Sequence, residues 1–228
     1  MSLILQIETA TTVCSVALSE NGNVLAYKEL EQRNVHAEII TLFIDEVLKT
    51  ADKRYQDLDA VAVSCGPGSY TGLRIGISVA KGLCFALDIP LIAIETLEGM
   101  VDGMISQDIL DDNTLLCPMI DARRMEVFTA VFNAKGDRVK STSAQIIDES
   151  SFSDLLKTNK ILFFGDGAEK CSEVLGINPN AQIIAGFTNS SRHITKKAAE
   201  KYKAKDFENV AYFEPYYLKD FIAGKKSI

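Results

Sequence analysis

The sequence predicts an α/β protein of two lobes, each with a mixed β-sheet flanked by helices. In each half of the chain an apolar run ends at a glycine turn and a helical pattern follows, first at residues 66–68 and again at residues 165–167. This repetition predicts a duplicated design with mixed sheets. We expect an N-terminal lobe over residues 1–106 and a C-terminal lobe over residues 107–228, and the last residues can return to the first lobe.

The N-terminal lobe opens with an antiparallel meander, because Asn21-Gly22 is a hairpin turn between two strand-like runs. The segment after the meander has apolar residues at helical spacing. The complete set expected for this lobe is strands over residues 3–8, 13–19, 24–30, 59–64 and 90–94 and helices over residues 36–51, 71–87 and 96–105.

The C-terminal lobe has shorter segments. A tight turn over residues 121–124 joins its first two strands, and the second glycine turn leads into a helix. The complete set expected here is strands over residues 115–120, 125–132, 139–147, 161–164 and 181–185 and helices over residues 152–158, 168–175 and 191–203.

Composition excludes several classes of protein. The 228 residues are 47% hydrophobic and 24% charged, as is ordinary for a globular protein. A formal net charge of -7 argues against broad, charge-driven binding to nucleic acid. No apolar run approaches the roughly 20 residues that cross a bilayer, and the N-terminus reads as a strand rather than a signal peptide. The five scattered cysteines fit reduced thiols, so we expect a cytoplasmic protein that makes no membrane contact.

The first glycine turn is a candidate nucleotide site. Its backbone N–H groups and two hydroxyls could hold phosphate. Alternatively, Ser69 or Thr71 caps the helix and Gly72 and Gly76 permit close packing. The spacing lacks the lysine of a Walker A loop and favours the structural interpretation. The candidate nucleotide-binding residues are Gly66, Gly68, Ser69 and Thr71.

Three further candidates each have an ordinary alternative. Glu8 could hold a metal-bound water or lie in a solvated turn. His36 could be a ligand or a base, although a partly exposed histidine at a helix start fits better. The loop over residues 121–126 could bind an anionic partner through two arginines or form a local ion-pair cluster. No metal site is predicted, because none of the familiar histidine or cysteine motifs is present.

Two helices, over residues 36–51 and 71–87, have more apolar residues than one buried face needs. Both could be internal, or their outer faces could bind another protein. The residues predicted for such an interface are His36, Ile39, Ile40, Phe43, Val47, Leu73, Arg74, Ile77 and Lys81.

Several stretches together resemble the bacterial TsaB (YeaZ) family of tRNA threonylcarbamoyladenosine biosynthesis. The most specific is Gly-Pro-Gly-Ser-Tyr-Thr-Gly-Leu-Arg over residues 66–74, and the others are residues 4–9, 14–18, 36, 121–127 and 214–218. The resemblance implies a duplicated actin-like, ribonuclease H-like fold of the kind found in Hsp70.

The resemblance also indicates what is missing. The catalytic relative, TsaD, has a His-Met-Glu-Gly-His metal motif where this chain reads Thr96-Leu-Glu-Gly-Met100. Threonine and methionine cannot replace imidazoles as ligands of a transition metal. The first strand usually ends in Asp-Thr-Ser, whereas Glu8-Thr9-Ala10 stands here, which weakens a phosphate or metal role for that turn.

The family therefore implies a non-catalytic subunit that binds TsaD, together with the ATPase TsaE. The complex would transfer threonylcarbamoyl to adenosine 37 of tRNAs that decode ANN codons. The chain would form a homodimer when alone, contact tRNA only through the complex, and bind no cofactor by itself, with ATP at the complex interface. The alternative is a stand-alone ATPase or a glycopeptidase-like enzyme.

Overall fold

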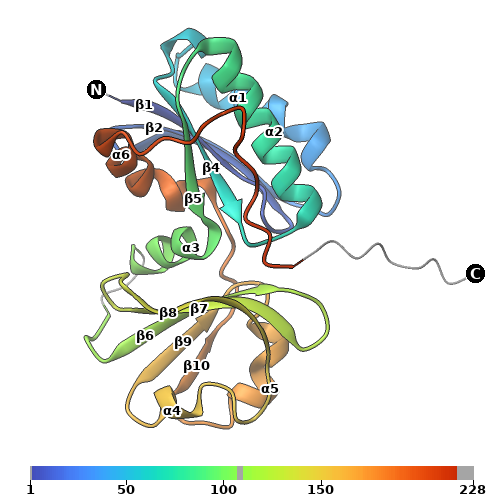
Figure 1. Ribbon diagram of the computed structural model, residues 1–228, viewed down its shortest axis with the longest axis vertical. Coiled ribbons are helices and arrows are strands. Elements are labelled where there is room, and N and C mark those ends of the chain that lie inside the picture. Colours follow the sequence, from blue (N-terminus) through green and yellow to red (C-terminus); the bar gives the residue numbers. More distant parts are fainter. Residues whose placement is uncertain (1, 107–109, 220–228) are drawn as a thin grey trace, which may run out of the picture.

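The structure is a computed structural model that describes residues 2–106 and 110–219. It consists of two lobes stacked along the long axis of the molecule (Figure 1). Each lobe contains one five-stranded sheet. The predicted class, two lobes with mixed sheets and flanking helices, is confirmed.

The N-terminal sheet has the strand order β3-β2-β1-β4-β5. Strands β1 to β3 form the antiparallel meander, and β1, β4 and β5 run parallel. Every residue of β1 is buried, because the sheet is covered on both faces. The strands are β1 (Leu3–Glu8), β2 (Val13–Glu20), β3 (Asn23–Glu31), β4 (Ala60–Gly66) and β5 (Leu91–Glu95).

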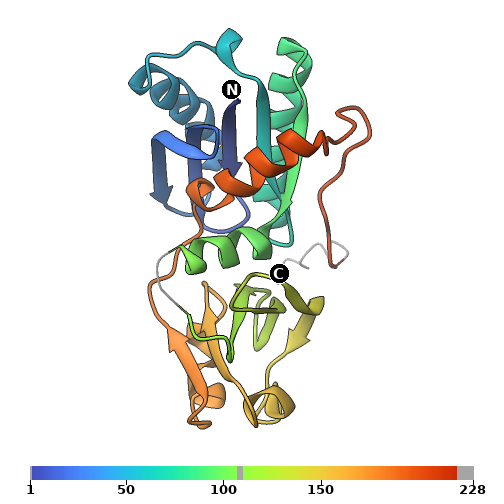
Figure 2. The same ribbon diagram turned by 90° about the vertical axis from the view of Figure 1, so that its left-hand side faces the viewer.

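Helices cover both faces of this sheet. On one face, α1 (His36–Thr50) and α2 (Tyr70–Leu87) enclose the larger core. On the other, α6 (Thr195–Ala204) and the short 3-10 helix before it (Ser191–Ile194) pack on β1, β4 and β5. Figure 2 shows α6 lying across the sheet on the side away from α1. The chain therefore returns to the N-terminal lobe after completing the second sheet.

The C-terminal sheet repeats the same design, in the order β10-β9-β6-β7-β8. Strands β6, β7 and β8, consecutive in the chain, pair antiparallel, and β6, β9 and β10 pair parallel. Its core contacts α3 (Thr96–Ile105), which lies between the two sheets. The strands are β6 (Thr114–Asp121), β7 (Glu126–Asn133), β8 (Arg138–Ile146), β9 (Lys160–Phe164) and β10 (Ala181–Ile184).

The helices of the C-terminal lobe are shorter than predicted. The segment expected over residues 152–158 is a single turn, α4 (Ser153–Leu156). It begins after residue 152 because Phe152 has a left-handed backbone with φ 62°. The segment expected over 168–175 divides into a 3-10 turn (Glu169–Cys171) and α5 (Ser172–Leu175). Among the described residues, no helix combines the length and the apolar character needed to cross a membrane.

Candidate functional site

The first glycine turn connects β4 to α2, and the space beside it is occupied by residues of the β1–β2 turn. The Ser69 side chain caps α2 by accepting a hydrogen bond from the Gly72 N–H at 3.2 Å. The Ser69 N–H donates to the Ala10 carbonyl oxygen at 2.7 Å. The turn between β1 and β2 therefore occupies the space above the helix N-terminus.

Gly68 in the turn and Gly72 and Gly76 in α2 are required by this close approach. A Cβ atom at Gly68 would lie 2.5 Å from the Ala10 carbonyl oxygen, and one at Gly72 would lie 2.1 Å from the Thr9 carbonyl oxygen. A Cβ atom at Gly76 would lie 2.2 Å from Thr9 Oγ1. These contacts support the structural interpretation of the turn. Nucleotide binding at Gly66, Gly68, Ser69 and Thr71 stays a prediction.

Glu8 ends β1 and points into the protein rather than into a solvated turn. Its side chain is 2% exposed. The Ala10 N–H donates to Oε1 at 2.6 Å, and the Ser64 hydroxyl donates to Oε2. Burial raises the pKa of Glu8 from its ordinary value of 4.5 to about 7, although the bonds from Ser64 and Ala10 oppose this change. Glu8 thus fastens the β1–β2 turn from beneath.

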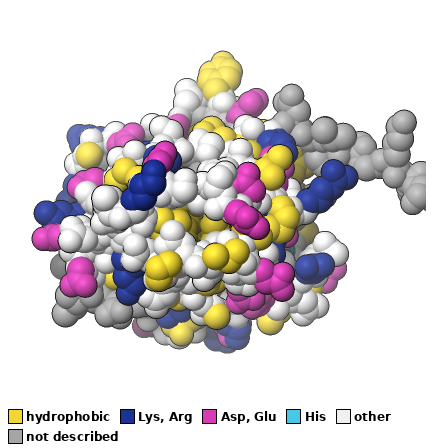
Figure 3. Space-filling model, turned by 90° about the horizontal axis from the view of Figure 1, so that it is seen from below, with side chains coloured by type: hydrophobic (Ala, Val, Ile, Leu, Met, Phe, Trp, Pro, Cys, Tyr) yellow, Lys and Arg dark blue, Asp and Glu magenta, His cyan; other side chains and the backbone are white. Residues whose placement is uncertain are grey.

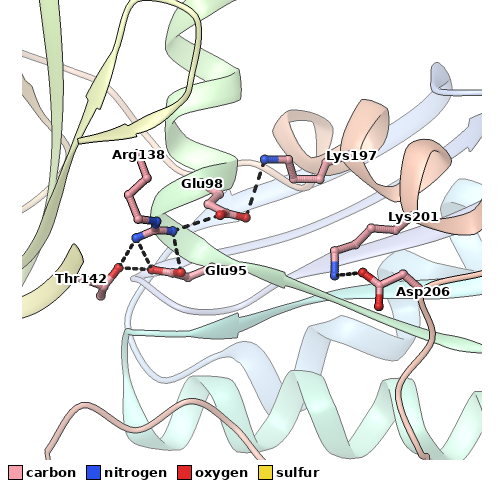
Figure 4. A network of polar contacts seen from close by, with 7 residues as sticks. All are labelled: Glu95, Glu98, Arg138, Thr142, Lys197, Lys201 and Asp206. Carbon is pink, nitrogen blue, oxygen red and sulfur yellow. Dashed lines mark hydrogen bonds and ion pairs between the residues drawn. The ribbon is translucent and has the colours of Figure 1, made fainter. Parts of the chain in front are cut away.

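The junction of the lobes contains a network of ion pairs (Figure 4). Arg138 of β8 reaches from the C-terminal lobe and lies 2.7 Å from Glu95 at the end of β5 and 3.0 Å from Glu98 of α3. Its guanidinium also donates to Thr142 Oγ1 at 2.5 Å. Lys197 of α6 approaches Glu98 at 3.6 Å. The carboxylate that the chain shares with the metal motif of TsaD is therefore paired with two cations of this chain.

The two positions that hold histidine in that motif are packed inside the protein. Thr96 is 1% exposed and Met100 is 2% exposed. Met100 belongs to the core beneath the C-terminal sheet, and its Cε would lie 2.4 Å from a Cβ atom at Gly165. No group of three or more His, Cys, Asp or Glu side chains within residues 2–106 and 110–219 could hold a metal ion.

Most of the predicted interface residues face the core instead of a partner. The buried members of the set are His36, Ile40, Phe43, Val47, Leu73 and Ile77. Arg74 bonds to Tyr217, and Lys81 bonds to main-chain carbonyls near the C-terminus. Ile39 is partly buried and packs against the same core. The apolar surplus of α1 and α2 is therefore largely explained by the sheet beneath them.

His36 is buried rather than partly exposed. Its Nε2 atom lies 3.1 Å from the Thr11 carbonyl oxygen and 3.2 Å from that of Val13. The imidazole therefore joins the start of α1 to the β1–β2 turn.

Two large apolar side chains on the outer faces of these helices lie outside the predicted interface set. Leu42 of α1 is 62% exposed and Phe85 of α2 is 85% exposed. Leu42 lies off the stripe formed by residues 36, 40, 43 and 47, so helical geometry could have separated it from the core positions. Exposed apolar side chains of this size on adjacent helices are candidates for contact with another protein.

In the loop over residues 121–126, the two acidic side chains pair with lysines from other parts of the chain and not with the arginines of the loop. Lys170 pairs with Asp121, and Lys219 pairs with Glu126 at 2.5 Å. Arg123 and Arg124 are exposed, with left-handed φ angles of 74° and 50°.

In Figure 3, which views the end of the C-terminal lobe, acidic and basic side chains are interspersed on that face. This pattern does not favour broad binding of nucleic acid there.

Comparison with known proteins gives the family. A family model described as "TsaD: tRNA N6-adenosine threonylcarbamoyltransferase" matches residues 23–219. The TsaB protein of Escherichia coli K12 is 40% identical over 129 residues, 57% of this chain and 54% of that protein. The TsaB protein of Haemophilus influenzae is 29% identical over 98% of this chain and 96% of its own length. The chain thus aligns with about half of the E. coli relative and with nearly all of the H. influenzae one.

Solved structures show the fold. YeaZ from Pseudomonas aeruginosa superposes with a TM-score of 0.82 at 24% identity, over 96% of this chain and 100% of that chain. The ethanolamine utilization protein EutJ from Carboxydothermus hydrogenoformans superposes with a TM-score of 0.52 at 10% identity, over 86% of this chain and 90% of that chain. With the family model and the TsaB relatives, these similarities lead to one assignment. The chain belongs to the tRNA N6-adenosine threonylcarbamoyltransferase (TsaD) family, as a member of the TsaB/YeaZ type.

Proposed function

We propose that the chain is a non-catalytic partner subunit in the biosynthesis of tRNA threonylcarbamoyladenosine. It binds and activates TsaD, and together with TsaE the complex transfers threonylcarbamoyl to adenosine 37 of ANN-decoding tRNAs. The names of the TsaB relatives support the pathway, and the family model supports kinship with the transferase.

One observation carries the non-catalytic part of the proposal. The region that resembles the metal motif of TsaD has Thr96 and Met100 in a packed core, and Glu98 is ion-paired to Arg138 and Lys197. At the two histidine positions Thr96 offers only a hydroxyl, and the Met100 thioether is a soft ligand that does not replace an imidazole and is packed in the core. The chain would therefore contribute contacts rather than chemistry.

The exposed apolar side chains support docking through α1 and α2. Leu42 and Phe85 each lose an unfavourable exposure to water when a partner covers them. We expect the same surface to form a homodimer when the chain is alone, and TsaD to replace the second copy. ATP, where it binds, would lie at the interface of the complex, and tRNA would be contacted through the complex in the cytoplasm.

The docking surface is tested by mixing purified chain with TsaD and measuring complex formation by analytical ultracentrifugation. Leu42→Glu and Phe85→Glu should each weaken the complex by at least about tenfold, because a carboxylate would be buried in an apolar contact. Ile177→Glu is the matched control, since Ile177 is 71% exposed on the other lobe. Unchanged assembly by both α1 and α2 variants would show that the surface is assigned wrongly.

The role of the subunit is tested by reconstituting tRNA modification with and without the chain. Activity that needs the chain, combined with no ATP or peptide turnover by the chain alone, is the expected result. Efficient ATP turnover by the isolated chain would instead favour the stand-alone enzyme.

A further inference from the structure

An extended segment near the end of the chain, the C-terminal strap (residues 208–219), contacts both lobes. It follows α6, passes along α2 and ends beside the C-terminal lobe, as the red segment of Figure 1 shows. Residues 208–219 contain no helix or strand, and none of them is fully buried. Its position is therefore set by individual contacts rather than by a core of its own.

Main-chain hydrogen bonds hold the strap on the N-terminal lobe at two places. The Glu208 N–H donates to the Leu91 carbonyl oxygen at 2.9 Å, an antiparallel bridge to the edge strand β5. The Tyr216 N–H donates to the Cys65 carbonyl oxygen at 2.7 Å, next to the glycine turn. These bonds extend from one edge of the sheet to the end of β4.

Side chains of α2 fasten the strap between those two points. Lys81 Nζ donates to the Phe213 carbonyl oxygen at 3.0 Å. The Tyr217 ring packs on Tyr70 with 4.9 Å between centroids, and Arg74 donates from Nε to the Tyr217 hydroxyl at 3.1 Å. Arg74 also lies over the Tyr70 ring at 4.3 Å, a cation–π contact.

The glycine turn accommodates the strap directly. Gly66 has φ 120°, and a Cβ atom there would lie 2.4 Å from the Tyr216 carbonyl oxygen. At its far end the strap reaches the other lobe, where Lys219 Nζ lies 2.5 Å from Glu126 Oε2. The strap thus links Gly66 in one lobe to β7 in the other.

We propose that the C-terminal strap is a releasable clasp that fixes the angle between the lobes. A second link is the ion-paired Arg138, whose side chain is 28% exposed and lies against Glu95, 20% exposed. The strap is the weaker link, because most of its polar contacts are exposed and its apolar contacts with the core are those of Val210 and Phe213, which are only partly buried. When it leaves α2, Arg138 and the packing of α3 against the C-terminal sheet remain as links between the lobes, and the angle between the lobes varies more widely.

Release of the strap is tested by hydrogen exchange on the full chain without any partner. The double variant Tyr217→Ala, Lys81→Met removes the ring contact and the lysine bond. We expect the Glu208 and Tyr216 amides to exchange at least about tenfold faster, while amides of β1 keep their protection. Tyr212→Ala is the matched control, since Tyr212 is 83% exposed on the same strap, and its amide rates should equal those of the wild type.

The lobe angle is measured with a fluorophore pair introduced as unnatural amino acids at positions 23 and 177, two exposed positions, one on each lobe and both outside the proposed docking surface. We expect a narrow distance distribution in the wild type and a broader one in the double variant and in Lys219→Met. Unchanged exchange at Tyr216, or equally narrow distributions in both variants, would overturn the proposal. If the double variant unfolds, Lys81→Gln alone gives the same comparison with a smaller change.

Discussion

The buried carboxyl of Glu8 leads to a prediction about stability and pH. In the folded chain its pKa is about 7, against an ordinary value of 4.5, and the cause is burial. Between these two pH values the folded state binds a proton that the unfolded state has lost. Stability from this group is therefore complete below pH 4.5 and is lost as the pH rises through 7.

The size of the effect follows from the two pKa values. Each pH unit between 4.5 and 7 is worth about 1.36 kcal/mol, so the wild type loses about 3 kcal/mol across this window through Glu8. Glu8→Gln keeps a side chain of the same shape that can still bond to Ser64 and the Ala10 N–H, but it carries no titratable proton. The variant should gain about 3 kcal/mol on the wild type between pH 4.5 and about pH 8.

A second buried group has the opposite sign and makes the test sharper. Burial lowers the pKa of His193 from 6.5 to about 4, so its contribution is present above pH 6.5 and is lost as the pH falls to 4. Between pH 4.5 and 6.5 in the wild type, the unfolding free energy contributed by Glu8 falls with pH while that contributed by His193 rises. In Glu8→Gln only the contribution of His193 depends on pH, so the unfolding free energy should rise with pH across this range.

The assay is urea unfolding of wild type and variant at half-unit steps from about pH 4.5 to about pH 8, with equal m-values required at each step. Glu38→Gln, which alters an exposed carboxylate of α1, is the control and should give a profile parallel to the wild type. Parallel profiles for Glu8→Gln and the wild type would refute the reasoning, because they would mean that Glu8 loses its proton at the same pH in the folded and in the unfolded chain.

Two further predictions concern packing and the lobe junction. Gly72→Ala should destabilise the chain by about 1–3 kcal/mol, because the new Cβ would lie 2.1 Å from the Thr9 carbonyl oxygen. Gly82→Ala in the same helix is the control, since its Cβ would lie in open space, and it should stabilise the chain by up to about 1 kcal/mol. Thermal unfolding of the two variants and the wild type measures the difference. Arg138→Met should lower the free energy of unfolding in urea by about 1–3 kcal/mol, since it leaves the carboxylates of Glu95 and Glu98 without their shared cation. The control is Lys157→Met, which breaks an exposed pair with Asp154 and should change that free energy by less than about 0.5 kcal/mol.

The duplicated sheets are predictable from the sequence because their signals are local. The turn at Asn21-Gly22 and the apolar runs that become β1 and β4 fix strands without knowledge of distant residues. The spacing alone also favours the glycine turn as a tight packing corner, and the close contacts around it support this interpretation. The sequence does not reveal that the carbonyl groups of Thr9 and Ala10 pack against this turn, because the position of α2 relative to the end of β1 depends on tertiary packing.

The predicted interface shows where periodicity stops being informative. An apolar stripe has the same spacing whether it meets a sheet or another protein, so Ile40, Phe43 and Leu73 look equally suited to either. Only residues outside the stripe can separate the two interpretations. Leu42 is such a residue, although on the sequence alone it only widens the apolar face of its helix.

The ion pairs at the lobe junction could not be predicted, because Arg138 and Glu98 are 40 residues apart and come from different lobes. Their arrangement nevertheless shows what Glu98 does in a chain that has no histidine at positions 96 and 100. The Glu98 side chain is 29% exposed, and pairing with a guanidinium and an ammonium compensates for the part of its hydration that it loses. With Glu98 used in this way, the junction holds α3 between the sheets instead of presenting a ligand. Restoring the two imidazoles by Thr96→His and Met100→His would therefore place them beside a Glu98 already committed to Arg138, and metal binding would need the junction to rearrange as well.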